Sequence, residues 1–328
     1  MIGLKMTPEV VYVLSAVKRD ASGSEVSRRR SDEQHNVFTN YGVDAIFGGT
    51  TGDSLYELAA VVGTGSATPL ITSQSLSAFK AGAYSPYGKG AGTWVDNGDG
   101  TGYVQTVWTT VFAAGVATGN ISEVGSAFRG TVPNSLTPLC SIALVLDAAG
   151  NPTTFEVLAD EELELTQYFR RHISYTDQAA VLSENGIEHI LTWRPGRLTG
   201  VGGSYNWPFP AGFVAGSGCF LGYSASGTPL VTLPPITSDA LPIINGGTGH
   251  GQANTSQGVQ FSMLPYTTGS KKRRCWLRFG TGDSLLQTWA SFDMSALGYW
   301  VMKIEPPVVK SGLHRFTLTM EFELDNTP

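Results

Sequence analysis

The sequence predicts an all-β protein, an antiparallel β-sandwich of jelly-roll or Greek-key type with long loops and one or two short helices. Glycine is abundant, at 40 of 328 residues, and Ser and Thr are common in the same stretches. Glycine supplies positive φ angles in turns, and Thr suits a pleated surface. Runs of β-branched and aromatic residues alternate with turn-rich stretches along the chain, the pattern of two-sheet folds.

The N-terminal part begins with a strand at Val10–Leu14, which is rich in β-branched and aromatic residues. The polar stretch Ala21–Glu33 predicts a loop or flexible arm. Apolar residues three and four positions apart predict a short helix in Val37–Phe47. A strand is expected at Leu55–Val62, followed by an extended surface segment over Ser66–Ser77.

A β-hairpin is predicted between Thr93 and Gly115. Its turn is Asp96–Gly100, where Asn-Gly and Asp-Gly supply the positive φ that tight hairpin turns require. The strand that follows, from Tyr103 to Val111, is dense in β-branched and aromatic residues.

The remaining strands are bounded by turns in the same way. Cys140–Leu146 is a predicted strand that ends in the turn Asp147–Pro152. Apolar and polar residues alternate at the start of Leu163–Phe169, which predicts a half-buried strand. Further strands are predicted at Phe155–Leu158, Cys275–Phe279, Tyr299–Ile304 and Arg315–Leu324.

This pattern predicts an N-terminal strand and flexible arm in residues 1–33 and a single large β-sandwich domain in residues 34–328. The stretch at about 196–272 is rich in Gly, Ser, Pro and Thr, which predicts a loop-rich insertion with a few short strands. Its aromatic residues make it too apolar for a disordered segment.

Charge and hydropathy exclude two classes of partner. The net charge of −6 argues against a dedicated nucleic-acid binder, because such proteins neutralise phosphates with cations. The basic runs Arg28–Arg30 and Lys271–Arg274 are interpreted as solvated loops or as a charged strand edge that blocks unwanted pairing. The alternative is an electrostatic contact with an acidic partner. No stretch approaches the roughly 20 apolar residues of a membrane helix, so no membrane insertion is expected.

Two features indicate synthesis in a reducing cytoplasm. The apolar run Val10–Val17 lacks a signal-peptide cleavage site. Cys140, Cys219 and Cys275 are odd in number and include no C-x-x-C pair, so we expect buried free thiols and no zinc or redox motif.

Three stretches superficially suggest a reactive site, and each fits a structural role better. Asn245–Gly251 resembles a phosphate-binding loop, but the residues after it are poor helix formers. Asp96 and Asp99 lack the spacing of a calcium loop. Asp160–Glu164 lies on one predicted strand, where adjacent carboxylates face opposite ways.

The five histidines lie far apart in the sequence, and no nucleophile elbow is found. We therefore expect no enzymatic activity and no cofactor. Aromatic residues in loops can stack on sugars, and Trp94, Tyr205 and Trp207 are the candidates for glycan contact. Packing in the core is the commoner role of such residues.

Four stretches in order along the chain combine turn glycines with apolar strand residues. They are Phe38–Ile46, Val62–Pro69 with Ser73–Leu76, Asp147–Pro152 with Asp160–Leu165, and Trp300–Pro307 with Lys310 and Leu318–Phe322. Together they resemble virion proteins of tailed bacteriophages, of the tail-fibre, collar or baseplate-decoration type. The first is similar to a Thr-Asn-x-Gly-Leu-Asp opening in those proteins, with Val43 in place of Leu.

The resemblance implies a virion structural protein that is made in the host bacterial cytoplasm and binds other virion proteins and copies of itself, as a trimer or ring. Such assembly agrees with an N-terminal segment, Met1–Glu33, that could dock on a neighbour as an added strand. The alternative is a carbohydrate-binding receptor-recognition module of the virion that contacts host surface glycan. A glycan-degrading enzyme would need two carboxylates in one cleft.

Overall fold

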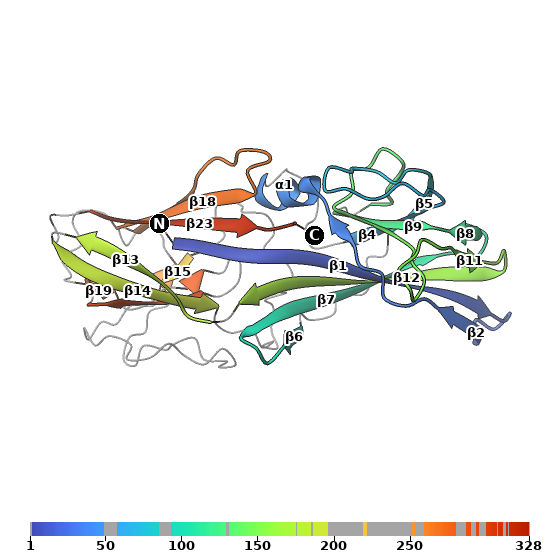
Figure 1. The fold of residues 1–328 in the computed structure, drawn as a ribbon, viewed down its shortest axis with the longest axis horizontal. Helices are drawn as coiled ribbons and strands as arrows, with labels where there is room; N and C mark the ends of the chain where they lie inside the picture. The colour runs from blue at the N-terminus through green and yellow to red at the C-terminus, as the bar shows by residue number, and fades with distance from the viewer. Residues whose placement is uncertain are drawn as a thin grey trace. The chain divides into compact units, whose positions relative to one another are not determined.

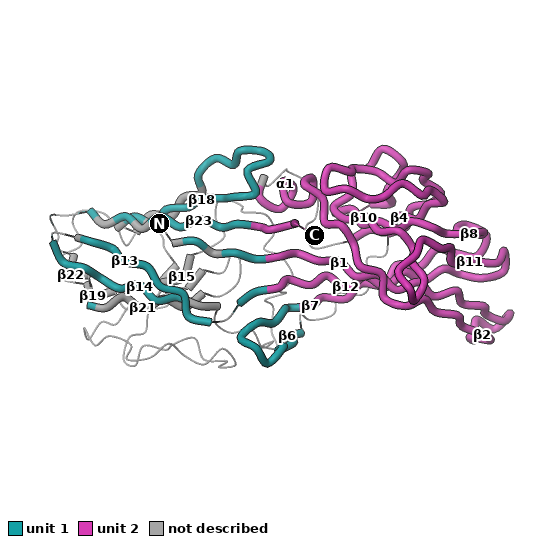
Figure 2. Tube along the Cα trace, viewed as in Figure 1, with its two compact units in different colours: residues 1–6, 93–104, 173–323 teal, residues 7–92, 105–172, 324–328 magenta. Residues whose placement is uncertain are grey.

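The computed structural model describes fifteen separate ranges of the chain. These are residues 2–48, 58–84, 93–128, 131–174, 176–184, 186–195, 219–221, 251–252, 259–279, 287–289, 293–294, 300–306, 308–310, 313 and 315–327. The chain divides into two compact units (Figure 2). Unit 1 is residues 1–6, 93–104 and 173–323, and unit 2 is residues 7–92, 105–172 and 324–328.

The first sheet of unit 2 is built around the two long strands β1 and β12, which pair antiparallel from Thr7↔His172 to Lys18↔Glu161. β2 pairs with the other side of β1, and β7 lies beside β12 (Figure 1). The bounds are β1 (Ile2–Arg19), β2 (Glu25–Arg30), β7 (Thr101–Phe112) and β12 (Glu161–Ser174). Along β12 buried residues alternate with partly exposed ones, as the sequence predicts for a strand of a packed sheet.

The second sheet of unit 2 has the strand order β3-β10-β9-β4-β5. Its strands are β3 (Val37–Phe38), β4 (Leu58–Gly63), β5 (Phe79–Ala83), β9 (Glu123–Phe128) and β10 (Ser141–Leu144). The short helix α1 (Asn40–Gly48) follows β3, and a small two-stranded sheet pairs β8 (Gly119–Ile121) with β11 (Phe155–Val157). Every residue of β4 and β9 is buried, so these strands are covered on both faces.

The two sheets of unit 2 pack face to face. Phe169 of β12 makes edge-to-face contacts with Phe38 of β3, at a centroid distance of 6.0 Å, and with Trp108 of β7, at 6.5 Å. The Tyr12 hydroxyl of β1 hydrogen-bonds the hydroxyl groups of Ser126 on β9 and of Ser141 on β10. The unit is therefore a β-sandwich whose core holds aromatic pairs and a small, satisfied polar cluster.

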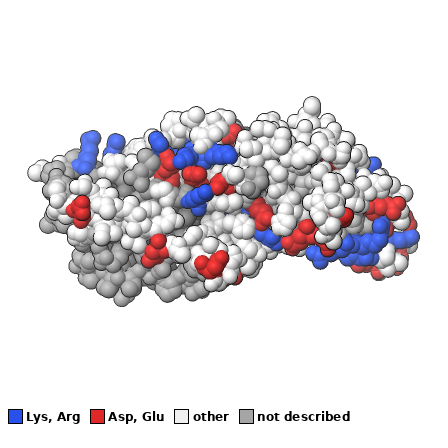
Figure 3. Space-filling view, in the orientation of Figure 1, with Lys and Arg blue, Asp and Glu red and all other residues white. Residues whose placement is uncertain are grey.

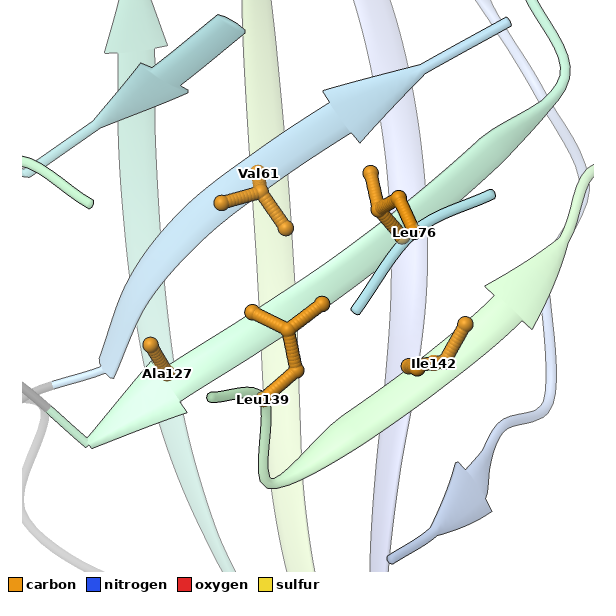
Figure 4. Packing of buried hydrophobic residues seen from close by; sticks show 5 residues of the cluster. All are labelled: Val61, Leu76, Ala127, Leu139 and Ile142. Atoms are coloured by element: carbon orange, nitrogen blue, oxygen red, sulfur yellow. The ribbon is translucent and has the colours of Figure 1, made fainter. Parts of the chain in front are cut away.

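The outer face of the five-stranded sheet is covered by two loop segments, which we call the cover segments (residues 64–78 and 131–139). Leu76 and Leu139 come from the cover segments and pack on Val61, Ala127 and Ile142 of the sheet (Figure 4). All five side chains are buried. Apolar packing on this face fixes the cover segments as a third layer of unit 2.

Unit 1 contains several groups of antiparallel strands. β17 (Val259–Met263), β18 (Lys272–Phe279) and β23 (Phe316–Leu324) are neighbours in that order, as are β13 (Gln178–Glu184), β14 (Ile187–Pro195) and β21 (Trp300–Glu305). β15 (Cys219–Leu221) lies between β16 (Gly251–Gln252) and β20 (Asp293–Met294), while β19 (Gln287–Trp289) pairs with β22 (Val308–Lys310). β6 (Thr93–Asp96) is the neighbour of β7.

The predicted fold class is confirmed: the described residues form many strands and one short helix. The predicted hairpin at Asp96–Gly100 is present, and helix α1 lies in the predicted place. On β23, Met320, Phe322 and Leu324 are buried, in agreement with the predicted alternation.

The segment 21–33 differs from the expected loop or flexible arm, because it contains strand β2. β1 pairs with β12 and β2 of its own chain and lies in the sandwich. That residues 1–33 dock on a neighbour as an added strand stays a prediction. The predicted division into residues 1–33 and 34–328 stays a prediction, and the two compact units have the bounds given above. Most of the stretch at about 196–272 lies outside the described residues.

A matched pair of leucines tests the sandwich core. Leu165 on β12 is fully buried, whereas Leu136 in a cover segment is 88% exposed. We expect Leu165→Ala to lower the free energy of unfolding of unit 2 by about 2–5 kcal/mol, because a buried cavity forms. Leu136→Ala should change it by less than about 0.5 kcal/mol. Urea unfolding followed by tryptophan fluorescence measures both, and equal effects would contradict the assigned core.

Candidate functional site

The residues predicted to contact glycan are not brought together by the described part of the structure. Trp94 lies on β6, but the structure does not describe its side chain. Tyr205, Trp207 and residues 245–250 of the glycine-rich stretch lie outside the described residues, and Gly251 begins β16. The prediction that these aromatic residues bind sugar therefore stays a prediction.

The acidic side chains of the β6–β7 turn have structural partners. Asp96 accepts a hydrogen bond from the Gly98 amide at 2.8 Å, and Asp99 accepts from the Thr101 amide at 2.9 Å. Hydrogen bonding by the Thr101 hydroxyl is the main reason that the pKa of Asp99 is lowered. The carboxylates close the hairpin turn, as expected of Asp in this position.

The basic run of β2 lies against the acidic start of β12. Arg28 pairs with Glu164 at 2.6 Å, and Arg29 pairs with Glu161 at 2.6 Å. Glu161 is buried and faces opposite to Glu162 and Glu164, as expected for adjacent residues of one strand. The dense mixture of positive and negative side chains at this end of unit 2 is visible in Figure 3. Glu162 and Glu164 both pair with Arg19, at 2.8 and 3.1 Å, so these carboxylates serve as partners of arginines.

β2 is an edge strand with two features that hinder pairing with a further strand. All six of its residues are exposed, and β1 is its only partner among the described strands. The register of β1 with β2 shifts between Lys18 and Arg19, which marks a β-bulge. Bulges and charged side chains both hinder the addition of a further strand. The structure thus fits the interpretation of Arg28–Arg30 as a charged edge.

A second polar cluster lies on the outer face of β1 and β12 and involves two histidines that are far apart in the sequence. His35 and His172 hydrogen-bond the two carboxylate oxygens of Glu9, at 2.8 and 2.9 Å. Arg170 lies 3.7 Å from Glu9 and 3.3 Å from Glu33. Burial raises the pKa of Glu9, but the histidine hydrogen bonds and the nearby charges outweigh it and lower the pKa from 4.5 to about 2.

Glu123 is a buried carboxylate of unit 2 with hydrogen bonds to both of its oxygens. It is 1% exposed and points into the first cover segment. One oxygen accepts from the amides of Gly65 and Ala78, at 3.0 and 2.7 Å, and the other accepts from the amide and hydroxyl of Ser77, both at 3.0 Å. A buried charge is tolerated here because four donors replace its hydration.

The approach of Glu123 depends on two glycines. A Cβ atom at Gly63 would lie 2.6 Å from a Glu123 carboxylate oxygen, and one at Gly65 would lie 2.5 Å from it. A Cβ atom at Gly65 would also lie only 1.8 Å from the Ser77 hydroxyl oxygen and would collide with it. The Val-Gly-Thr-Gly part of the chain is therefore shaped to receive a carboxylate.

Two of the three cysteines are described, and both are buried free thiols, as expected. Burial raises the pKa of the Cys275 thiol to about 12 and that of Cys140 further. Neither is a reactive thiolate near neutral pH. Cys219 lies on β15, and its side chain is outside the description.

Comparison with protein-family models, with curated proteins and with solved structures finds no match. Among the described residues, no group of three or more His, Cys, Asp and Glu side chains could hold a metal ion. In the same part of the chain, no helix has the length and apolar character needed to cross a membrane. The candidate functional features of unit 2 described above are the β2 edge, the Glu9 cluster and the cover segments.

The Glu9 cluster predicts a pH-dependent contribution to stability. Because the folded-state pKa of Glu9 is depressed, its contribution is present above the ordinary value of 4.5 and is lost as the pH falls towards about 2. We expect Glu9→Gln to be less stable than the wild type by about 2 kcal/mol at pH 7, after allowance for solvent screening. The difference should vanish by about pH 2. Urea titrations at several pH values measure it.

Glu156→Gln, at an exposed position of β11 in the same unit, serves as the control and should leave the pH profile unchanged. A stability difference between Glu9→Gln and wild type that stayed constant from pH 7 to pH 2 would contradict the assigned role of Glu9.

Glu123→Gln should release the first cover segment. The amide NH2 group would face hydrogen-bond donors, which leaves them unpaired at a cost of about 2–4 kcal/mol. Amide hydrogen exchange should accelerate at Gly65, Ser77 and Ala78. Ser73→Ala removes a single hydrogen bond from the same segment, to the Leu70 amide, and should have a much smaller effect. Unchanged exchange in Glu123→Gln would show that other contacts hold the segment.

Proposed function

We propose that this protein is a structural component of a tailed-bacteriophage virion that acts through protein–protein assembly. The observation that carries the proposal is the position of the stretches that resemble phage virion proteins. Within unit 2 these stretches form the framework that fixes the layers of the sandwich. Residues with such roles suit a part that must hold its shape.

The first stretch joins β3, helix α1 and the second cover segment. The Thr39 hydroxyl donates to the Leu139 carbonyl at 2.7 Å and accepts from the Gly42 amide at 3.1 Å. A Cβ atom at Gly42 would lie 2.7 Å from the Cys140 carbonyl oxygen, so glycine permits the close packing of the helix. This contact supports a structural role for the Thr-Asn-x-Gly pattern.

The second and third stretches act in the same way. Gly63 and Gly65 make room for Glu123, which holds the first cover segment. In the turn after β10, Asp147 accepts from the amides of Ala149 and Asn151, both at 2.9 Å. Each stretch therefore fixes a turn or a layer of unit 2.

The cover segments offer the most suitable contact surface for assembly. They carry three exposed apolar side chains on a fixed backbone: Leu70 at 59%, Val132 at 62% and Leu136 at 88%. Exposed apolar groups on a preorganised surface favour association with other subunits. The partners in this proposal are copies of the same chain and other virion proteins.

Sedimentation velocity of the full chain, together with mass spectrometry of gradient-purified particles, tests the proposal. We expect the chain to self-associate with rising concentration and to be present in intact particles at many copies. Leu136→Asp should weaken self-association at least tenfold. Val26→Asp, at a 59% exposed position on β2, is the matched control and should not. A chain that stays monomeric and is absent from particles would contradict the proposal.

A further inference from the structure

The outward face of β18 in unit 1 carries a row of cations interrupted by a tryptophan. Cys275 is buried, so the residues of opposite parity face outward: Lys272, Arg274, Trp276 and Arg278. Opposite them on β23 lie Glu323, Glu321, Thr319 and Thr317, in that order. The partners thus change from acids to hydroxyl residues along the strand.

At the acidic end the cations are neutralised. Lys272 pairs with Glu321 at 3.1 Å and with Glu323 at 3.2 Å. Arg274 pairs with Glu321 at 2.7 Å. Hydrogen bonding by Arg274 is the main reason that the pKa of Glu321 is lowered. This half of the face is a closed ion-pair network.

At the other end the cation has no acid opposite it. The guanidinium of Arg278 stacks over the ring of Trp276, 4.4 Å from its centroid. Arg278 makes no ion pair with any residue of the described part of the chain. Thr317 is exposed, while Thr319, Trp276 and Arg278 are partly exposed.

We propose that Trp276, Arg278, Thr317 and Thr319 form a binding site for an acidic saccharide. A stacked guanidinium keeps its N–H donors in its own plane, where they can bind a carboxylate in bidentate fashion. The uncovered part of the indole can contact the C–H groups of a sugar ring. The two threonine hydroxyl groups supply donors and acceptors for sugar hydroxyls.

The charge distribution favours an acidic saccharide over a nucleic acid. Nucleic-acid binding draws its affinity from several cations that contact successive phosphates. Here the two neighbouring cations of the row are held by glutamates, which leaves Arg278 as the free cation of the described β18/β23 face. A single cation beside an aromatic ring and hydroxyl groups matches one carboxylate on a sugar.

The site is distinct from the cover segments, and its test is independent of the proposed assembly role. Isothermal titration calorimetry of the full chain uses tetragalacturonate as the acidic probe. Maltotetraose is the neutral control, and a fifteen-nucleotide oligothymidylate is the nucleic-acid control. Arg278→Gln and Trp276→Leu test the site, and Arg274→Gln removes a cation from the neutralised half of the same face.

Saturable binding of tetragalacturonate, at least tenfold tighter than of maltotetraose, is expected for the wild type. Arg278→Gln should weaken it at least tenfold, whereas Arg274→Gln should change it less than twofold. Thermal unfolding of each variant checks that the fold is retained, and Trp276→Leu gives a second measure of the site. Absence of saturable binding, equal binding of the neutral sugar, tighter binding of the oligonucleotide or an unaffected Arg278→Gln variant would each overturn the proposal.

Discussion

The packing of two sheets around Phe169 and Tyr12 is the constraint on which the rest of unit 2 depends. Phe169 fills the space between the sheets with aromatic contacts to Phe38 and Trp108. Tyr12 crosses the same space and is satisfied by two serine hydroxyl groups of the facing sheet. Because a buried hydroxyl without a partner is costly, this cluster admits one alignment of the sheets and disfavours others.

The layers outside the sandwich are held by polar groups in addition to apolar area. Glu123 binds the first cover segment through four donors, and Glu9 lies between two histidines at the other sheet. A hydrogen bond on the surface adds little stability, because water binds the same groups. Removal of a polar side chain from a buried site, however, leaves its hydrogen-bond partners unpaired. They fix where a segment lies and also add to the stability of the fold.

Local patterns in the sequence predicted the elements that depend on local chemistry. The alternation that ends in Met320, Phe322 and Leu324 predicts a strand with one buried face, and Asn97-Gly98 predicts a hairpin turn. Strand β2 was not predicted, because its residues are polar. Its backbone pairs with β1, and its arginines form ion pairs with carboxylates of β12, and neither contact is visible in the local sequence.

The polar clusters depend on contacts between residues far apart in the chain. Glu123 meets Gly65 across 58 positions, and Glu9 meets His172 across 163. No spacing rule in a single sequence reports such contacts. The one available signal was the pair of glycines in Val-Gly-Thr-Gly, which marks a close approach without naming its partner.

In the described structure, the stretches of unit 2 that resemble phage virion proteins fix turns and layers of the sandwich. A rigid unit with exposed apolar groups on fixed cover segments is suited to repeated contact with neighbouring subunits. At the β2 edge, the bulge and the arginines are features that hinder the addition of a further strand.

Cryo-electron microscopy of intact particles tests this account most directly. It predicts symmetric density into which unit 2 fits repeatedly, with the cover segments buried against a neighbouring subunit and the β2 edge left unpaired. Particles without such density, or copies joined by strand addition at β2, would contradict it.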